Sequence, residues 1–216
     1  MIYKFAERSN YEDFAAGHVI YHRPGFTNYP VRLASEIFMR AYTHCGREMV
    51  KLYDPCCGGG YLLTVLGFLH GDKISAIYGS DISAEAVFLS KRNLQLLSPD
   101  ALLGRGVGEK AESATRLVSL CRNIEVEIFA RDVLSQNNNP PADIIVTDIP
   151  YGDMTFWKQG SEVAGVSLML QNLNAEIVAV SSDKKQKIAI ADEKNYRRLE
   201  KFNVGKRKIE ILRYGE

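Results

Sequence analysis

The chain has 216 residues, of which 46% are hydrophobic and 25% charged, and its formal net charge is +1. This is an ordinary globular composition for one domain, or for one domain with an appendage. No apolar run approaches the roughly 20 residues of a membrane span, and the charged N-terminus has no signal-peptide core. We therefore expect a soluble cytoplasmic protein with no membrane partner.

The predicted elements begin with an N-terminal helical extension, residues 1–49, which precedes a main domain, residues 50–216. In the extension, residues 30–42 place apolar side chains on one helical stripe, with Pro30 near the first turn. From residue 50, short apolar segments that predict strands alternate with segments that predict helices. The predicted strands are 49–54, 74–81, 124–133, 142–148, 175–182 and 206–214, with a strand or turn at 187–191. The predicted helices are 61–70, 83–97, 109–123, 162–174 and a short one at 196–203.

Strands that alternate with helices indicate βαβ units, and therefore a doubly wound, mainly parallel α/β sheet with helices on both faces. Segments 142–148 and 175–180 contain few polar residues, which is typical of central strands. Ligands of such folds bind beyond the carboxyl ends of the strands, where the strand order reverses. The functional site is therefore expected at those strand ends.

The first strand end carries Asp-Pro-Cys-Cys-Gly-Gly-Gly, residues 54–60. Glycines let the backbone turn sharply and approach a ligand, and the next helix directs its N-terminus at the same place. A phosphate, a metal or a positively charged cofactor could occupy such a loop, and a tight structural turn is the plain alternative. The dinucleotide spacing G-x-G-x-x-G fails at Leu63, and the Gly-Lys-Ser/Thr of a P-loop is absent.

The cysteines favour reduced, mostly buried thiols rather than a metal site. Cys45, Cys56, Cys57 and Cys121 form no C-x-x-C pair, and no histidine lies at metal spacing from them. Adjacent Cys56 and Cys57 point in different directions and are poor joint ligands for one zinc ion. We expect no bound metal.

The second strand ends in Asp81, 21 residues after Gly60. A carboxylate there can accept two hydrogen bonds from a ribose diol, although a lone aspartate before a helix is equally typical of a cap. Asp132, after the third strand, is expected near an adenine amine. The cofactor-binding candidates are Asp54, Cys56, Gly58, Gly60, Asp81, Ile82, Asp132 and Asp148.

The strand at 142–148 ends in Asp-Ile-Pro-Tyr-Gly, residues 148–152. In the usual strand order the first and fourth strands are neighbours, so Asp148 should face the glycine loop. Tyr151 can stack on a flat base, while Asp148 and the carbonyl near Pro150 accept a hydrogen bond from its N–H. These three are the catalytic candidates; a tight turn is the structural alternative. Because the glycine loop has an acid and no Lys or Arg, we interpret the ligand as S-adenosylmethionine, whose sulfonium and ammonium are positive.

The segments "DPCCGGGYLLTVLG", "GSDIS" and "DIIVTDIPYG" resemble the motifs of class I S-adenosylmethionine-dependent methyltransferases. Together with "GHVIYHRPGFTNYPVRLASEIF" and "NLQLLSP", they resemble the avilamycin-resistance ribosomal RNA methyltransferase family from about residue 17 to the end. The resemblance implies a Rossmann-like, seven-stranded methyltransferase domain at 50–216, with residues 1–49 covering the cofactor or contacting the substrate. It also implies methylation of a guanine base of 23S ribosomal RNA, with resistance to an orthosomycin antibiotic as one consequence.

The resemblance assigns roles to the candidate residues. The glycine loop holds the methionine part of the cofactor, Asp81 holds the ribose, and Asp148, Pro150 and Tyr151 meet the target base. The chain departs from the usual pattern at Ile149, where many nitrogen-directed methyltransferases have proline, and at Cys56, where the usual loop has glycine. The methylated ring atom is therefore left open.

Charge is unevenly distributed along the chain, since residues 183–216 carry eleven Lys or Arg against six Asp or Glu. A basic C-terminal part can bind a polyanion such as ribosomal RNA, although an ordinary solvated surface has the same composition. The candidates for RNA contact are Arg23, Arg32, Trp157, Lys184 and Lys185, then Phe156, Arg197, Arg198, Lys206 and Arg207.

Three other functions compete with this interpretation. One is a methyltransferase acting on DNA, tRNA, a protein or a small molecule, and another is a non-catalytic RNA-binding module. A nicotinamide-dependent oxidoreductase is disfavoured, because the chain lacks G-x-G-x-x-G and an evident proton-donor pair. A monomer is favoured, but the oligomeric state is left open.

Overall fold

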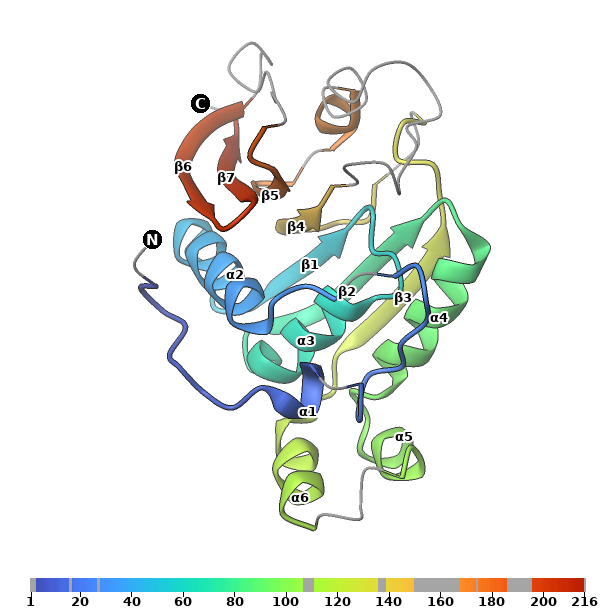
Figure 1. The fold of residues 1–216 in the computed structure, drawn as a ribbon. Helices are drawn as coiled ribbons and strands as arrows, with labels where there is room; N and C mark the ends of the chain where they lie inside the picture. The colour runs from blue at the N-terminus through green and yellow to red at the C-terminus, as the bar shows by residue number, and fades with distance from the viewer. Residues whose placement is uncertain are drawn as a thin grey trace.

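The computed structural model describes residues 3–15, 17–26, 28–106, 111–135, 139–149, 168–173, 175–185 and 196–215. They form a seven-stranded sheet with helices packed on it (Figure 1). The strands are β1 (Val50–Asp54), β2 (Ile74–Asp81), β3 (Glu125–Ala130), β4 (Ile144–Asp148), β5 (Ile177–Asp183), β6 (Tyr196–Val204) and β7 (Arg207–Tyr214). The helices are α1 (Glu12–Ala15), α2 (Val31–Cys45), α3 (Tyr61–His70), α4 (Ala84–Gln95), α5 (Pro99–Gly104) and α6 (Ala111–Leu120).

The sheet confirms the predicted doubly wound fold. Its strand order is β3-β2-β1-β4-β5-β7-β6. Strands β1 to β5 pair in parallel, whereas β7 pairs antiparallel with both β5 and β6. The chain moves outward from β1 to β3 and then returns to β4 on the other side of β1, so the strand order reverses between β1 and β4. Ligands of open α/β sheets bind at such a point.

The central strands are buried on both faces, which explains their continuous apolar sequences. Leu52 and Tyr53 are neighbours in β1, point to opposite faces, and are both fully buried. Helices α2, α3 and α4 cover the face of Leu52 (Figure 1). Met169 and Leu170, in a helical segment at 168–172, pack in the cluster on the face of Tyr53.

Helix boundaries follow local capping signals. Ser83 caps α4 by accepting a hydrogen bond from the Ala86 N–H at 3.3 Å. Ser98 caps α5 in the same way, and Pro99 occupies the first turn of that helix. Because Ser98 caps a new helix and Pro99 begins it, the helix predicted at 83–97 is followed by a separate short helix that was not predicted.

The short helix predicted at 196–203 is wrong, because this segment is the edge strand β6. Its alternation of charged and apolar residues is weak, and local propensity alone favoured a helix. A tight turn at Gly205 returns the chain into β7, and pairing with β7 along nearly its whole length makes the segment a strand. The predicted segments at 162–167 and 187–191 lie outside the described residues.

The N-terminal extension is only partly helical. Residues 17–26 form an irregular segment, here called the strap, between α1 and α2. The first residues of the chain are fixed to α2 by Glu36, whose buried carboxylate accepts backbone N–H bonds from Lys4, Phe5 and Ala6 at 2.8–2.9 Å. Burial raises the pKa of Glu36, but these hydrogen bonds and Arg40 outweigh it and lower the pKa overall.

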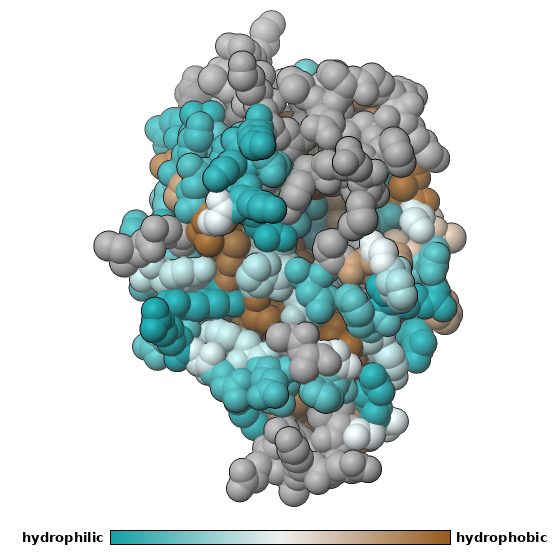
Figure 2. Space-filling model, viewed as in Figure 1, coloured by the Kyte–Doolittle hydropathy of each residue, from teal (hydrophilic) through white to brown (hydrophobic). Residues whose placement is uncertain are grey.

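One face of the protein is mainly hydrophilic. Figure 2 shows one face, where hydrophilic side chains dominate and apolar ones form small patches between them. Across the ranges that the structure describes, no helix combines the length and the apolar character needed to cross a bilayer.

Candidate functional site

Three aspartates end three adjacent strands and meet at one edge of the sheet. Asp81 ends β2, Asp54 ends β1 and Asp148 ends β4. Because β1 lies between β2 and β4 and all three are parallel, their carboxyl ends lie side by side (Figure 1). The predicted meeting of these residues at the switch point is therefore present in the fold.

Asp54 lies beneath the glycine loop rather than at its surface. Asp54 is only 2% exposed, and its Oδ1 accepts hydrogen bonds from Thr147 Oγ1 at 2.8 Å and Cys56 N at 3.0 Å. Burial raises the pKa of Asp54 to about 7, and the negative charges of Asp148 and Asp81 act in the same direction. Asp54 thus shapes the loop and places a carboxyl group of unusual basicity under it.

The glycine loop is set by close packing of α3 against α4. Gly60 has a positive φ of 75°, and a Cβ built on it would lie 2.9 Å from Ser90 Cα in α4. Its N–H donates to Cys57 O at 2.8 Å, which closes the turn that precedes α3. Only glycine suits both the left-handed backbone and the close approach.

Asp81 already holds part of the loop. Its Oδ2 accepts from Gly58 N at 3.0 Å and its Oδ1 from Ser83 N at 2.9 Å. A carboxylate oxygen can accept a second hydrogen bond, so both remain able to accept from hydroxyl groups. Ile82, the next residue, is a large apolar side chain that is 51% exposed.

Asp132, Cys56 and Cys57 lie near Asp54 and Asp81, at the same end of the sheet. Arg131 N donates to Asp81 O at 3.0 Å, which fixes the loop after β3 to the end of β2, and Asp132 Oδ1 accepts from Leu134 N at 2.9 Å. Burial raises the pKa of Cys56 well above its ordinary value, and negative charges, including that of Asp132, add to it. The described residues contain no cluster of His, Cys, Asp or Glu suited to a metal ion.

Asp148 has a cationic neighbour that comes from the far end of the sequence. Arg207 begins β7, and its Nη2 lies 3.8 Å from Asp148 Oδ2. Burial raises the pKa of Asp148, while the Ser181 hydroxyl and the positive charge of Arg207 act in the opposite direction. Pro150 and Tyr151, predicted beside Asp148, and Phe156 and Trp157, predicted to contact RNA, lie outside the described residues.

The strap lies over the glycine loop, and buried Asn93 of α4 holds it there. Asn93 Oδ1 accepts from Tyr21 N at 2.7 Å, and its Nδ2 donates to Tyr21 O at 3.1 Å and Gly59 O at 2.8 Å. Phe26 Cδ1 lies 3.7 Å from the position of a Cβ on Gly59. Neither Asn93 nor Phe26 carries a functional signal in the sequence, because their importance depends on contacts between residues 33 or more positions apart.

The basic candidates divide into two groups. Arg23 pairs with Glu85, while Arg32 donates to Ala6 O at 3.0 Å and lies over the Tyr3 ring, so these two make contacts within the protein. Lys184, Lys185 and Lys206 are exposed. Lys184 N donates to Lys206 O at 2.9 Å, which joins the end of β5 to the turn before β7, at the sheet edge that carries Asp148.

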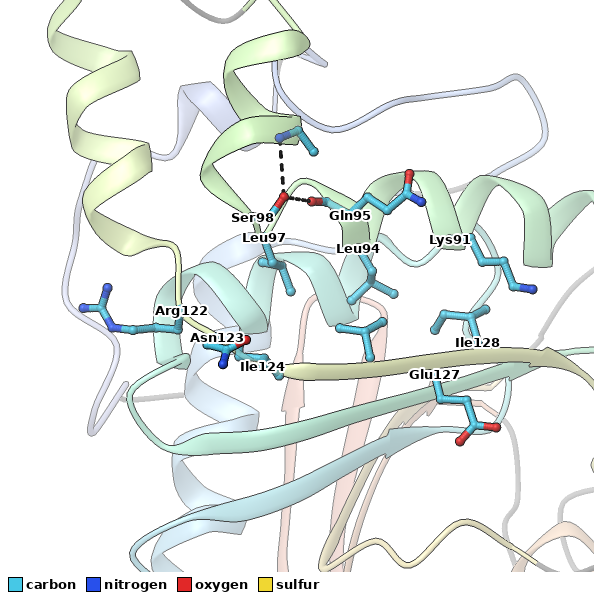
Figure 3. Close-up of a pocket in the computed structure, with 12 residues that line it drawn as sticks. Lys91, Leu94, Gln95, Leu97, Ser98, Arg122, Asn123, Ile124, Glu127 and Ile128 are labelled. Atoms are coloured by element: carbon cyan, nitrogen blue, oxygen red, sulfur yellow. Dashed lines mark hydrogen bonds between the residues drawn. The ribbon is translucent and has the colours of Figure 1, made fainter.

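A separate cavity of about 580 Å³ lies away from this site (Figure 3). The second half of α4, the start of α5 and the edge strand β3 form its walls, with Lys91, Ser98, Arg122 and Glu127 among the polar lining residues. None of the predicted site residues lines it. It lies toward the amino end of β3, whereas the aspartates lie at the carboxyl ends of the strands.

Comparisons with known proteins agree with the fold. The family model described as rRNA methyltransferase AviRa matches residues 1–207. The 23S rRNA (guanine(2535)-N(1))-methyltransferase of Streptomyces viridochromogenes is 35% identical over 236 residues, which cover 96% of this chain and 93% of the relative.

Solved structures give the same result. The rRNA methyltransferase AviRa from Streptomyces viridochromogenes aligns over 99% of this chain and 96% of its own, with 30% identity and a TM-score of 0.83. A putative RNA methyltransferase from Pyrococcus horikoshii, at 14% identity and a TM-score of 0.57, shares the fold over 99% of this chain and 93% of its own. The resemblance seen in the sequence motifs is thereby confirmed: the chain belongs to the AviRa family of ribosomal RNA methyltransferases.

Proposed function

We propose that the protein transfers a methyl group from S-adenosylmethionine to a guanine base of 23S ribosomal RNA. The observation that carries the proposal is the meeting of Asp81, Asp54 and Asp148 at the strand-order reversal, beside a glycine turn. Membership of the family supports methyl transfer to ribosomal RNA, and the name of the Streptomyces relative supports guanine.

The residues around the glycine loop fit the cofactor. Residues 54–60 contain no Lys or Arg to hold a phosphate, whereas buried Asp54 places negative potential below the loop, which suits a cation. Asp81 has acceptor capacity left for the two ribose hydroxyls, and exposed Ile82 offers an apolar face beside it for the adenine ring. When bound, S-adenosylmethionine supplies a methyl carbon that is already electrophilic because it is attached to a sulfonium.

The state of the two loop thiols supports a ring nitrogen, rather than a ring carbon, as the methyl acceptor. Methylation of a pyrimidine carbon requires a cysteine thiolate that adds to the ring. Burial raises the pKa of both Cys56 and Cys57 well above the ordinary value, and nearby acids add to this effect, so both remain neutral thiols. The remaining task of the protein is to align a nitrogen with the methyl carbon and to accept its proton.

We assign to Asp148 the role of accepting this proton. It ends β4 beside the glycine loop, and burial raises its pKa, which improves a carboxylate as a base. By the family resemblance, Pro150 and Tyr151 also meet the target guanine, with Tyr151 stacked on it. Exposed Lys184, Lys185 and Lys206, on the same sheet edge, contact phosphates of the RNA.

Transfer of labelled methyl groups tests the proposed function. The purified protein is incubated with labelled S-adenosylmethionine and with ribosomes or 23S RNA from cells that lack the enzyme, and mass spectrometry locates the modified base. We expect one methylated guanine. Labelling of DNA, tRNA, protein or a small molecule instead would replace the proposed substrate, and binding of RNA without any transfer would favour a non-catalytic module.

Substitution of Asp81 tests the cofactor site separately. Asp81→Ala removes an acceptor of two ribose hydrogen bonds, each worth about 1.5–3 kcal/mol to a charged group, so the Kd for S-adenosylmethionine should rise at least about tenfold. Calorimetry on the free protein measures it. Asp72→Ala is the matched control, because Asp72 is exposed and precedes the opposite end of the same strand. Equal affinities in the two variants would remove Asp81 from the site.

A further inference from the structure

Arg207 is the least expected member of the catalytic corner. It lies 59 positions after Asp148 in the chain, yet its guanidinium reaches the carboxylate across β5, at 3.8 Å between Nη2 and Oδ2. Both side chains are about one-fifth exposed, at 21% and 20%. They are therefore mostly withdrawn from water but still reachable by a ligand.

The guanidinium is held in place by stacking rather than by a close ion pair. It lies over the ring of Tyr29, which immediately precedes Pro30 and α2, with 4.8 Å to the ring centroid. An arginine whose only task was to neutralise Asp148 would normally make two parallel hydrogen bonds of about 2.7–2.9 Å. Here the separation is longer, and among the described residues Arg207 Nε has no hydrogen-bond partner. The side chain is oriented, but its donors are not used up.

A carboxylate beside a guanidinium matches the edge of guanine on which N1 and O6 lie. N1 carries a hydrogen that must leave before the nitrogen can attack, and O6 gains negative charge as that hydrogen leaves. Adenine presents the opposite pattern on this edge, with an acceptor at N1 and a donor at N6, so the same pair rejects adenine. The match depends on the close spacing of the two side chains, which only the folded sheet provides.

We propose that Arg207 donates a hydrogen bond to O6 of the target guanine while Asp148 accepts the proton from N1; this rests on the proposed function. The N1 proton moves to the Asp148 carboxylate, and the N1 electron pair forms a bond to the methyl carbon. The bond from that carbon to sulfur breaks, and its electron pair stays on sulfur. Positive charge on the sulfonium and negative charge on the carboxylate are both lost, so charge balances.

The role predicts a loss in rate rather than in cofactor binding. Removal of one donor to a developing oxyanion costs about 10²–10³-fold in rate, so Arg207→Ala should lower the single-turnover rate at saturating RNA by that factor. The Kd for S-adenosylmethionine should stay within about threefold. Lys201→Ala is the matched control, since Lys201 is a half-exposed cation on the same hairpin, 4.0 Å from Glu210 rather than near Asp148.

The pH profile separates charge stabilisation from a structural role. The charged groups that face Asp148 in the described structure are Arg207 from β7 and Asp54 from β1. Without Arg207 the guanine anion is less stable, so the rate of Arg207→Ala should recover toward the wild-type rate as pH rises. A variant that was merely misfolded would show the same loss at every pH.

Replacement of O6 in the RNA tests the contact directly. With a fragment that carries 6-thioguanine at the target, the sulfur accepts hydrogen bonds poorly, so the wild-type rate should change by a factor that Arg207→Met and Arg207→Ala, which lack a donor, do not show. The intrinsic acidity of the altered base cancels in this ratio. If the oxygen-to-sulfur ratio is the same in wild type and variants, or if the loss lies wholly in RNA affinity, the role of Arg207 is wrong. If wild type itself methylates no guanine, the proposed function fails instead. Should Arg207→Ala not fold, Arg207→Met, which is closer in length and has no donor, gives the answer.

Discussion

Asp148 and Asp54 end neighbouring strands but differ in what surrounds them. Asp54 is buried under the glycine loop with hydrogen bonds from Thr147 and Cys56, whereas Asp148 retains one-fifth of its exposure and faces Arg207. The first is therefore placed to influence a bound cation through its charge, and the second to receive a proton from a substrate. These different surroundings give the two residues separately measurable effects.

Asp148→Asn should abolish most of the methyl transfer. The amide keeps the size of the side chain but cannot accept the proton, and loss of a general base costs about 10²–10⁴-fold. The Kd for S-adenosylmethionine, measured by calorimetry, should remain close to that of wild type. Transfer at a rate near that of wild type would show that another group accepts the proton.

Asp54 should couple cofactor binding to pH. Its folded-state pKa of about 7 is raised, so its contribution to stability is present below the ordinary carboxyl pKa and is lost as pH rises through 7. A sulfonium bound above it favours the ionised carboxylate, so binding should tighten from roughly pH 6 to roughly pH 8 and should release a proton. Asp148 and Asp81 are the acidic groups that face it.

Calorimetry in buffers of different ionisation enthalpy measures that proton. Asp54→Asn is the control, because asparagine can still accept from Thr147 and Cys56 but cannot titrate. The amino group of the cofactor titrates with either protein, so only the difference between them reports Asp54. Identical pH dependence in the two proteins would contradict the coupling.

At the scale of elements, the glycine loop depends on how closely α3 approaches α4. Ser90 of α4 lies directly against Gly60, and Asn93, one turn further along α4, holds both the loop and the strap. One helix therefore fixes both the glycine loop and the strap. A change in this contact should affect stability and cofactor binding together.

Gly60→Ala should destabilise the protein more than an alanine at a glycine of the same backbone conformation. Gly106 has φ 76° against 75° for Gly60, but a Cβ there meets nothing within 4 Å. Both substitutions cost about 1–2 kcal/mol for the left-handed backbone, and Gly60→Ala adds about 1–3 kcal/mol of overpacking against Ser90. Thermal unfolding should show a Tm for Gly60→Ala lower by several degrees than that of Gly106→Ala; equal Tm values would mean that the α3–α4 contact yields easily.

At the scale of the whole molecule, the net charge is only +1, but the edge of the sheet at the carboxyl ends of its parallel strands is basic. Lys184, Lys185 and Lys206 come from two separate segments and gather at the carboxyl edge of the sheet because β7 returns antiparallel beside β5. Residues 1–182 carry 16 Lys or Arg against 20 Asp or Glu, so RNA binding should depend on this edge rather than on the overall charge.

Combined replacement of Lys184, Lys185 and Lys206 by alanine should weaken RNA binding and flatten its salt dependence. Each phosphate contact that is lost reduces the slope of log K against log salt by about 0.7–0.9, so the slope should fall by about 2. Filter binding across a range of salt concentrations measures it, with Lys91→Ala and Lys201→Ala combined as the control, since both are exposed but lie elsewhere. An unchanged slope would place the RNA on another surface.

The sequence alone determined the architecture and the strand ends at which three aspartates meet. Apolar runs that alternate with helical stripes define βαβ units. Three of these runs end in an aspartate, which can be read directly from the sequence. Asp54, Asp81 and Asp148 could therefore be placed together before the structure, because parallel strands bring their carboxyl ends to one edge whatever their separation in the chain.

Only the tertiary structure decided the features that depend on contacts between distant segments of the chain. Residues 196–203 became a strand because β7 was available to pair with them, although their local pattern favoured a helix. Arg207 reached Asp148 because β7 returns antiparallel beside β5, and the inward turn of the Asp54 carboxylate depends on Thr147 from another strand. Local periodicity fixes which residues face a sheet edge, but pairing between distant strands fixes which of them meet.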